Sequence, residues 1–213
     1  MPGFDAKKVA EIHQHLHSHL PAESALRIKA LETLLVEKGL VNSETIDRWV
    51  EAYTEVIGPK RGAHVVARAW CDEGFRQRLL DDAPAAIDEF GYLGKATGHL
   101  KVVENTDRVH NLVVCTLCSC YPFSILGIAP AWYKAAAYRS RAVRDPRGVL
   151  SEFGVELEED TEVRVWDSTA ELRYLVLPQR PSGSESLSED ELAGLVTRNS
   201  MIGTDRVLKG VVE

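Results

Sequence analysis

Three of the chain's four cysteines lie within six residues, in the segment Cys115-Thr-Leu-Cys118-Ser-Cys120. A β-branched apolar run precedes this segment and Pro122 follows it, so the pattern predicts a strand that ends in a tight turn. Cys118 and Cys120 are too close for an easy disulfide, and any pairing within the turn leaves one thiol over. Crowded thiolates are good ligands for soft or borderline transition metals, so the turn predicts a metal site.

Three kinds of metal site compete for these cysteines. Structural zinc and an iron–sulfur cluster both need a fourth ligand, which only the distant Cys71 or scattered histidines would supply. In a mononuclear site the sulfurs and backbone amides of the turn supply nearly all ligands, and one position stays open for substrate or water. The spacing alone leaves these alternatives open. We expect Cys71, a lone cysteine, to be a small core residue rather than a ligand.

Composition narrows the function class. The 213 residues are 45% hydrophobic and 27% charged, with a net charge of −7, which argues against nucleic acid or an anionic membrane as the main partner. The first residues show no signal-peptide pattern, and no apolar run is long enough to span a membrane. Four cysteines without a secretory segment therefore predict a cytoplasmic protein.

The sequence pattern divides the N-terminal part of the chain into two regions. Residues 1–20 contain alternating histidines at positions 13, 15, 17 and 19, which we interpret as a flexible, solvated arm rather than as a metal site. Residues 21–60 show helical periodicity over 22–38 and 44–57, each with an apolar stripe. These helices either pack on the rest of the chain or form an arm that contacts a partner subunit, and periodicity does not decide between the two.

Residues 61–213 predict one α+β domain of layered helices and sheet. Short helices are expected near 61–70, 72–80 and 84–90, and strands over 99–105 and 109–114, directly before the cysteine turn. Residues 122–130 are expected to be irregular and 130–140 to form one helix. The remaining pattern predicts a short helix over 145–154, strands over 161–166 and 171–177, and a last helix that begins with the capping box at Ser188.

Several further stretches accompany the cysteine turn and together carry a family resemblance. They are Val103-Glu-Asn-Thr106, Tyr138-Arg-Ser-Arg-Ala-Val-Arg144, Val165-Trp-Asp-Ser168, Tyr174-Leu-Val-Leu-Pro-Gln-Arg-Pro181, Leu195-Val-Thr-Arg198 and Ser200-Met-Ile-Gly203. With Val114-Cys-Thr-Leu-Cys-Ser-Cys-Tyr-Pro122, they resemble the α subunit of nitrile hydratase, over roughly residues 22–203. The histidine arm lies outside this resemblance.

The resemblance implies a ligand set. Cys115, Cys118 and Cys120 would bind one non-corrin Co(III) or Fe(III) through sulfur, and the backbone nitrogens of Ser119 and Cys120 would complete five ligands. Family members oxidise the cysteine matching Cys118 to sulfinic acid and the one matching Cys120 to sulfenic acid. Members with Thr at the position of Thr116 usually carry cobalt, so low-spin cobalt is expected here rather than iron.

The resemblance also implies a reaction and partners. A lyase of this family hydrates a small-molecule nitrile, of a size left open, to the amide, and Cys120 carries or activates the attacking oxygen. The hydroxyl of Ser119 either assists at the metal or is merely small enough for the turn to close. A β subunit, in an αβ or α2β2 assembly, would supply arginines to the oxidised cysteines, and an accessory activator protein would insert the metal. The alternative is the γ subunit of thiocyanate hydrolase, which uses the same turn with cobalt.

Residues outside the turn have weaker assignments. Tyr121 and Phe123 line a substrate pocket or belong to the core. Many family members have Trp and Pro where this chain has Phe123 and Ser124, so a bulky nitrile would fit. The cations Arg139, Arg141 and Arg144 are expected at the interface with the partner subunit, the alternative being a solvated face.

Overall fold

The computed structural model describes residues 23–53, 58–92 and 99–207, so the expected histidine arm lies outside the described residues. The chain divides into two compact units, Met1–Val50 and Glu51–Glu213. Over the described part of the chain, every helix is too short or too polar to cross a bilayer.

The first unit contains α2 (Glu23–Glu37) and α3 (Ser43–Glu51), at the positions that helical periodicity predicts. Most of their large apolar side chains are exposed, and Leu31, Leu34 and Trp49 are 57%, 53% and 59% exposed. No described residue of this unit is buried, so these helices have no core of their own.

The second unit begins with α4 (Gly58–Cys71), α5 (Glu73–Asp81) and α6 (Ala83–Asp88). Asp72 caps the start of α5, because its carboxylate accepts a hydrogen bond from the amide of Phe75 at 2.9 Å. Cys71 is exposed at the end of α4, beyond the last buried residue of that helix, Ala69. The prediction that Cys71 is a core residue was therefore wrong.

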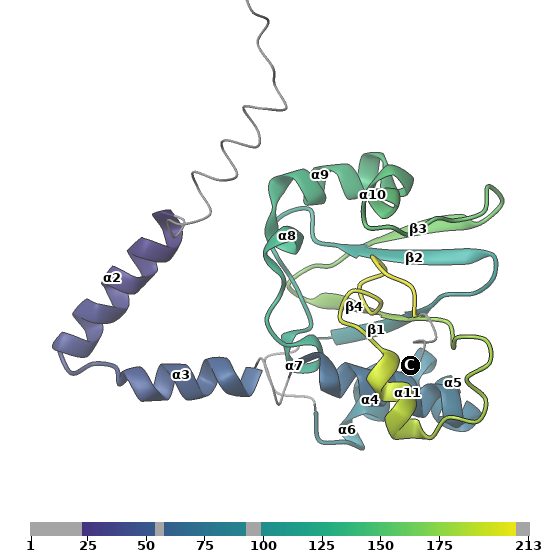
Figure 1. Cartoon of the computed structure of the whole chain (residues 1–213), viewed down its shortest axis with the longest axis horizontal. Helices are drawn as coiled ribbons and strands as arrows, with labels where there is room; N and C mark the ends of the chain where they lie inside the picture. The colour runs from purple at the N-terminus through teal and green to yellow at the C-terminus, as the bar shows by residue number, and fades with distance from the viewer. Residues whose placement is uncertain (1–22, 54–57, 93–98, 208–213) are drawn as a thin grey trace, which may run out of the picture. The chain divides into compact units, whose positions relative to one another are not determined.

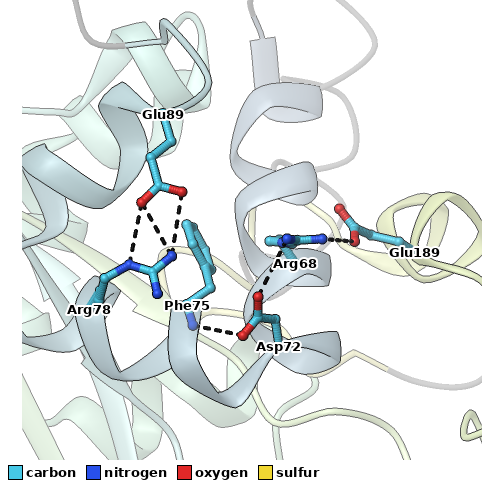
Figure 2. Close-up of polar contacts among 6 residues, drawn as sticks. All are labelled: Arg68, Asp72, Phe75, Arg78, Glu89 and Glu189. Carbon is cyan, nitrogen blue, oxygen red and sulfur yellow. Dashed lines mark hydrogen bonds and ion pairs between the residues drawn. The ribbon is translucent and has the colours of Figure 1, made fainter.

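Ion pairs connect these helices at the surface (Figure 2). Arg68 of α4 lies 3.4 Å from Asp72 and 3.4 Å from Glu189 of α11 (Glu189–Leu195). Arg78 of α5 pairs with Glu89, just after α6, at 3.3 Å. Exposed pairs of this kind contribute little stability each, so they orient the helix ends rather than hold the fold together.

In the described residues, four strands form two parallel pairs. β1 (His99–Glu104) pairs with β4 (Leu172–Leu177), and β2 (Val109–Val114) pairs with β3 (Glu162–Asp167). The first and last strands in sequence, β1 and β4, are thus partners, and the two middle strands, β2 and β3, are the other pair. The register places Val114, the last residue before the cysteine turn, opposite Asp167.

Helices cover both sides of the strands (Figure 1). α9 (Ala136–Arg144) and α10 (Pro146–Glu152) contact β2 and β3, whereas α5 and α6 contact β1, and α11 packs on α4. The expected α+β domain of layered helices and strands is confirmed.

A buried C-terminal segment joins the two strand pairs. The carbonyl of Ile202 accepts a hydrogen bond from the amide of Val113 in β2, and the carbonyl of Met201 accepts one from Val176 in β4, both at 2.9 Å. Gly203 has a φ of +92°, and a Cβ there would lie 1.9 Å from the carbonyl oxygen of Asn111. Only glycine fits this contact.

Two local predictions after the cysteine turn were wrong. Residues 122–130 contain a short helix, α7 (Phe123–Leu126), which is too short to give a periodic signal. The single helix expected over 130–140 is divided into α8 (Ala131–Lys134) and α9, because Ala135 takes an extended conformation with ψ 133°. This break places Tyr133 and Tyr138 on separate helices.

Candidate metal centre

The three cysteine sulfurs of the turn converge on one point. The Sγ atoms of Cys115 and Cys118 are 3.5 Å apart and those of Cys118 and Cys120 are 3.3 Å apart, and all three lie within 4.8 Å of one another. In the described part of the chain, no histidine, carboxylate or fourth cysteine joins this group. A tetrahedral zinc site or an iron–sulfur cluster therefore lacks its fourth side chain here.

Asp167 anchors the start of the turn. Its carboxylate accepts one hydrogen bond from the amide of Thr116 at 2.9 Å and another from the Thr116 hydroxyl at 2.6 Å. The parallel pairing of β2 and β3 brings Asp167 to this place. Sequence reasoning did not single out Asp167, although it lies in the stretch Val165-Trp-Asp-Ser168 that supports the family resemblance.

Two further side chains hold backbone carbonyls of the turn. Arg139 donates from Nη1 to the carbonyl of Thr116 at 3.3 Å, and the hydroxyl of Tyr133 donates to the carbonyl of Cys120 at 2.9 Å. Sequence reasoning missed Tyr133 in this role. Between the anchored ends the turn faces solvent, and Leu117 is 87% exposed.

The three sulfurs differ in environment. Cys115 is fully buried and accepts a hydrogen bond from the amide of Cys118 at 3.3 Å. The hydrogen bond with Cys120, together with that from Cys115, lowers the pKa of Cys118 to about 7. Burial and the contact with Cys118 raise the pKa of Cys120 to about 12. The exposed Cys118 is therefore the thiol of this pair that ionises first.

The two aromatic residues after the turn lie in different surroundings. The ring of Tyr121 is buried and packs edge-on against Tyr133, with centroids 5.1 Å apart. Burial raises the pKa of Tyr121 far above its usual range, and its hydroxyl has no hydrogen-bond partner among the described residues. Phe123 is half-buried, and its ring lies 5.6 Å from that of Tyr53.

The three arginines of α9 do not act as one group. Arg139 turns toward the cysteine turn, and its buried Nε has no hydrogen-bond partner in the part of the chain that the structure describes. Arg141 pairs with Glu152 at 2.8 Å and lies 3.6 Å from Asp145. Arg144 is exposed. Of the three, Arg144 is thus the exposed one, and the other two are half-buried.

A separate cavity of about 520 Å³ lies at the other end of β2, where Asn105, His110 and Thr161 line it. His110 is buried there and donates from Nε2 to the carbonyl of Gly203 at 2.7 Å. Burial lowers the pKa of His110, and the nearby Arg206 lowers it further. Because this cavity lies away from the cysteines, we place the functional centre at the turn instead.

Comparison with known proteins agrees with this assignment. A model of the family "Nitrile hydratase, alpha chain" matches residues 22–205. The low-molecular weight cobalt-containing nitrile hydratase subunit alpha of Rhodococcus rhodochrous is 55% identical over 194 residues, 90% of this chain and 94% of the relative. The thiocyanate hydrolase subunit gamma of Thiobacillus thioparus is 39% identical, over 82% of this chain and 76% of the relative.

Solved nitrile hydratase structures have the same fold as this chain. A double mutant of the Fe-type nitrile hydratase from Comamonas testosteroni Ni1 matches with a TM-score of 0.80 and 44% identity, over 89% of this chain and 92% of that chain. The fold and the cysteine turn define a metal-binding hydratase subunit. The chain belongs to the nitrile hydratase α-chain family.

Proposed function

We propose that this chain is the α subunit of a cobalt nitrile hydratase, which adds water to a nitrile and releases the amide. The observation that supports this most directly is the convergence of three cysteine sulfurs within one turn, without a fourth protein side chain among the described residues. A site of this kind needs backbone donors, and the amides of Ser119 and Cys120 lie within the turn.

The donor set fits cobalt. Three soft sulfur ligands suit a transition metal, and the relatives named cobalt-containing are up to 55% identical to this chain. When bound, low-spin Co(III) supplies a Lewis acid that makes the nitrile carbon electrophilic. Iron(III) is the less favoured alternative, and Thr116 at the start of the turn supports cobalt over it.

Exposure supports different chemical states for the cysteines. Cys118 is exposed and Cys120 is half-buried, whereas Cys115 is fully buried. An oxidant therefore has access to the first two, which we assign as the sulfinic acid (Cys118) and the sulfenic acid (Cys120). Cys115 stays a plain thiolate.

Two residues of the turn act in the reaction. Cys120, as the sulfenate, provides the oxygen that attacks the nitrile carbon or activates the water that does so. Ser119 is exposed beside it, and its hydroxyl orients that oxygen by a hydrogen bond. Phe123, half-buried just after the turn, and Tyr121 form the inner wall of the substrate pocket.

The chain acts with a β subunit, as membership of the α-chain family implies. Exposed apolar side chains support such a partner, both at the metal turn (Leu117) and along α2 and α3. We assign residues 21–60 as the arm that contacts it and 61–213 as the catalytic domain. The partner also contacts Arg139, Arg141 and Arg144 and supplies cations to the oxidised sulfurs, in an αβ or α2β2 assembly. An accessory activator protein loads the metal in the cytoplasm.

One experiment tests this function. The chain is co-expressed with its β subunit in cobalt-supplemented medium, and metal content, the mass of the cysteine peptide and amide production from a nitrile are measured. One cobalt per chain, three added oxygen atoms on the peptide containing Cys118 and Cys120, and amide formation are expected. Zinc at that stoichiometry with unmodified cysteines would contradict the proposal.

The alternative function is thiocyanate hydrolysis, and the 39% identity to a thiocyanate hydrolase γ subunit supports it. The same preparation distinguishes the two reactions. Ammonia and carbonyl sulfide from thiocyanate, with no amide formed from a nitrile, would decide for the alternative.

A further inference from the structure

Tyr133 contacts the cysteine turn from the protein interior. It lies on α8, its side chain is fully buried, and its hydroxyl donates to the carbonyl of Cys120 at 2.9 Å. The same ring packs edge-on against Tyr121, with centroids 5.1 Å apart and an interplanar angle of 65°. One side chain therefore holds both the carbonyl of the third cysteine and the side chain of the next residue.

These contacts determine the orientation of one peptide group. The carbonyl of Cys120 and the amide of Tyr121 belong to the same planar unit, so fixing the oxygen and the Tyr121 ring fixes the plane. That plane sets the direction from which the chain leaves Cys120. At the other end of the turn, Asp167 holds Thr116 through two hydrogen bonds. The separation of Cys115 and Cys120 is thus determined by these two anchors.

We propose that Tyr133 is a positioning residue for the metal site: its hydroxyl holds the backbone of Cys120 so that the three sulfurs are arranged before the metal enters. This inference rests on the proposed function of the turn as a cobalt site. Tyr133 acts through Cys120 and does not contact the substrate. Residues that orient metal ligands typically contribute 10- to 100-fold to metal affinity or activity.

Tyr138 provides a matched control. It lies on α9 in the same aromatic cluster, with its ring centroid 5.8 Å from that of Tyr133, and it is also buried. Its hydroxyl donates to the carbonyl of Val113 at 2.7 Å. That acceptor lies within β2, where pairing with β3 already holds the backbone. Y138F and Y133F therefore each remove one buried hydroxyl bonded to a backbone carbonyl, but only Y133F releases the metal turn.

The test is a Co(II) titration of the reduced, metal-free complex with the β subunit, without oxygen, followed by thiolate-to-cobalt absorption. We expect Y133F to weaken Co(II) binding about 10-fold or more and Y138F to change it less than about threefold. Thermal unfolding of the metal-free proteins should show similar losses for both variants. A Y133F dissociation constant within about threefold of the wild-type value would overturn the inference. If the wild-type complex itself bound no cobalt, the proposed function would fail with it.

A second substitution covers the case in which Y133F does not fold. Site-specific 3-fluorotyrosine at position 133 keeps the ring and makes the hydroxyl a stronger donor. We expect it to shift the thiolate-to-cobalt absorption maximum, and the same replacement at position 138 to leave it in place. Equal spectra for the two replacements would overturn the positioning role.

Discussion

Asp167 follows Thr116 by 51 residues in the sequence, yet its carboxylate accepts two hydrogen bonds from that residue. A carboxylate that holds both an amide and a hydroxyl fixes the backbone where the turn leaves β2. Arg139 adds a hydrogen bond to the carbonyl of the same residue. The polar groups of Thr116 are therefore all held by residues from other elements, which keeps Cys115 in place for the metal.

Replacing Asp167 tests this contact. D167A should lower the free energy of unfolding by about 1–2 kcal/mol, because two hydrogen bonds to a charged but exposed acceptor are lost. Cobalt incorporation should fall with it, as measured by elemental analysis of the purified complex. D160A, which removes an exposed carboxylate from the loop before β3, serves as the control. Equal cobalt contents in D167A and D160A would contradict the anchoring role.

His110 predicts a dependence of stability on pH. Burial and Arg206 lower its pKa in the folded protein from an ordinary value of 6.5. Between the lowered pKa of His110 in the folded protein and its pKa of 6.5 in the unfolded chain, the unfolded chain binds more protons than the folded one. The stability that His110 contributes above pH 6.5 is therefore lost as the pH falls below that value. The loss amounts to at most about 1.4 kcal/mol per pH unit.

Urea unfolding at several pH values between 7.5 and 5 measures this loss. H110Q should flatten the dependence, because glutamine can still donate to the carbonyl of Gly203 but does not titrate. An unchanged slope in H110Q would assign the acid sensitivity to other groups.

At the scale of elements, the parallel pairing of β2 with β3 decides where the metal turn lies. The segment with Met201 and Ile202 then bonds to both strand pairs and is buried between them. Gly203 allows this approach, because its φ of +92° and the missing Cβ bring the backbone against Asn111. The stretch Ser200-Met-Ile-Gly203, part of the family resemblance, therefore has a packing role.

Substitution of Gly203 should damage the fold. G203A adds a Cβ 1.9 Å from a carbonyl oxygen and forces alanine to a positive φ, which should cost at least about 3 kcal/mol of unfolding free energy. G194A on α11 is the control, because a Cβ there meets nothing within 4 Å. Helix propensity predicts a gain of up to about 1 kcal/mol for G194A. Chemical denaturation of both variants checks the difference, and similar midpoints would contradict it.

At the scale of the whole molecule, the two units differ in what they bury. The second unit has a core, whereas the described residues of α2 and α3 expose their apolar side chains. Apolar helices without a core are explained by a partner that covers them. This agrees with the proposal that residues 21–60 contact the β subunit.

The arm proposal predicts an effect on assembly without an effect on folding. Replacing Leu31 and Leu34 with Ser should weaken the αβ complex at least about tenfold, since two leucines lose burial against the partner. The thermal midpoint of the isolated chain should not change, because neither side chain is buried in it. Replacing Lys29 and Lys38 with Ser is the control. An αβ dissociation constant equal to that of the control would contradict the arm assignment.

Local patterns were sufficient for much of the fold. Periodicity, caps and β-branched runs located most helices and all four described strands, because the residues that decide these elements are neighbours in sequence. They failed at α7, at the break between α8 and α9, and at Cys71. The helix α7 is too short to give a periodic signal, and Cys71 lies beyond the last buried residue of α4. At the break between α8 and α9, Tyr133 and Tyr138 bond to carbonyls of distant residues, which local patterns do not contain.

The cysteine turn shows the same division. Its residues alone predicted a metal site that followed a strand, because sulfur chemistry and close spacing are local properties. Its anchors could not be read locally: Asp167 arrives through parallel pairing across 51 residues, and Tyr133 through the extended conformation of Ala135 between two short helices. Hydrogen bonds between distant segments form only once the strands and helices are packed, so the tertiary structure decides which side chains hold the cysteines.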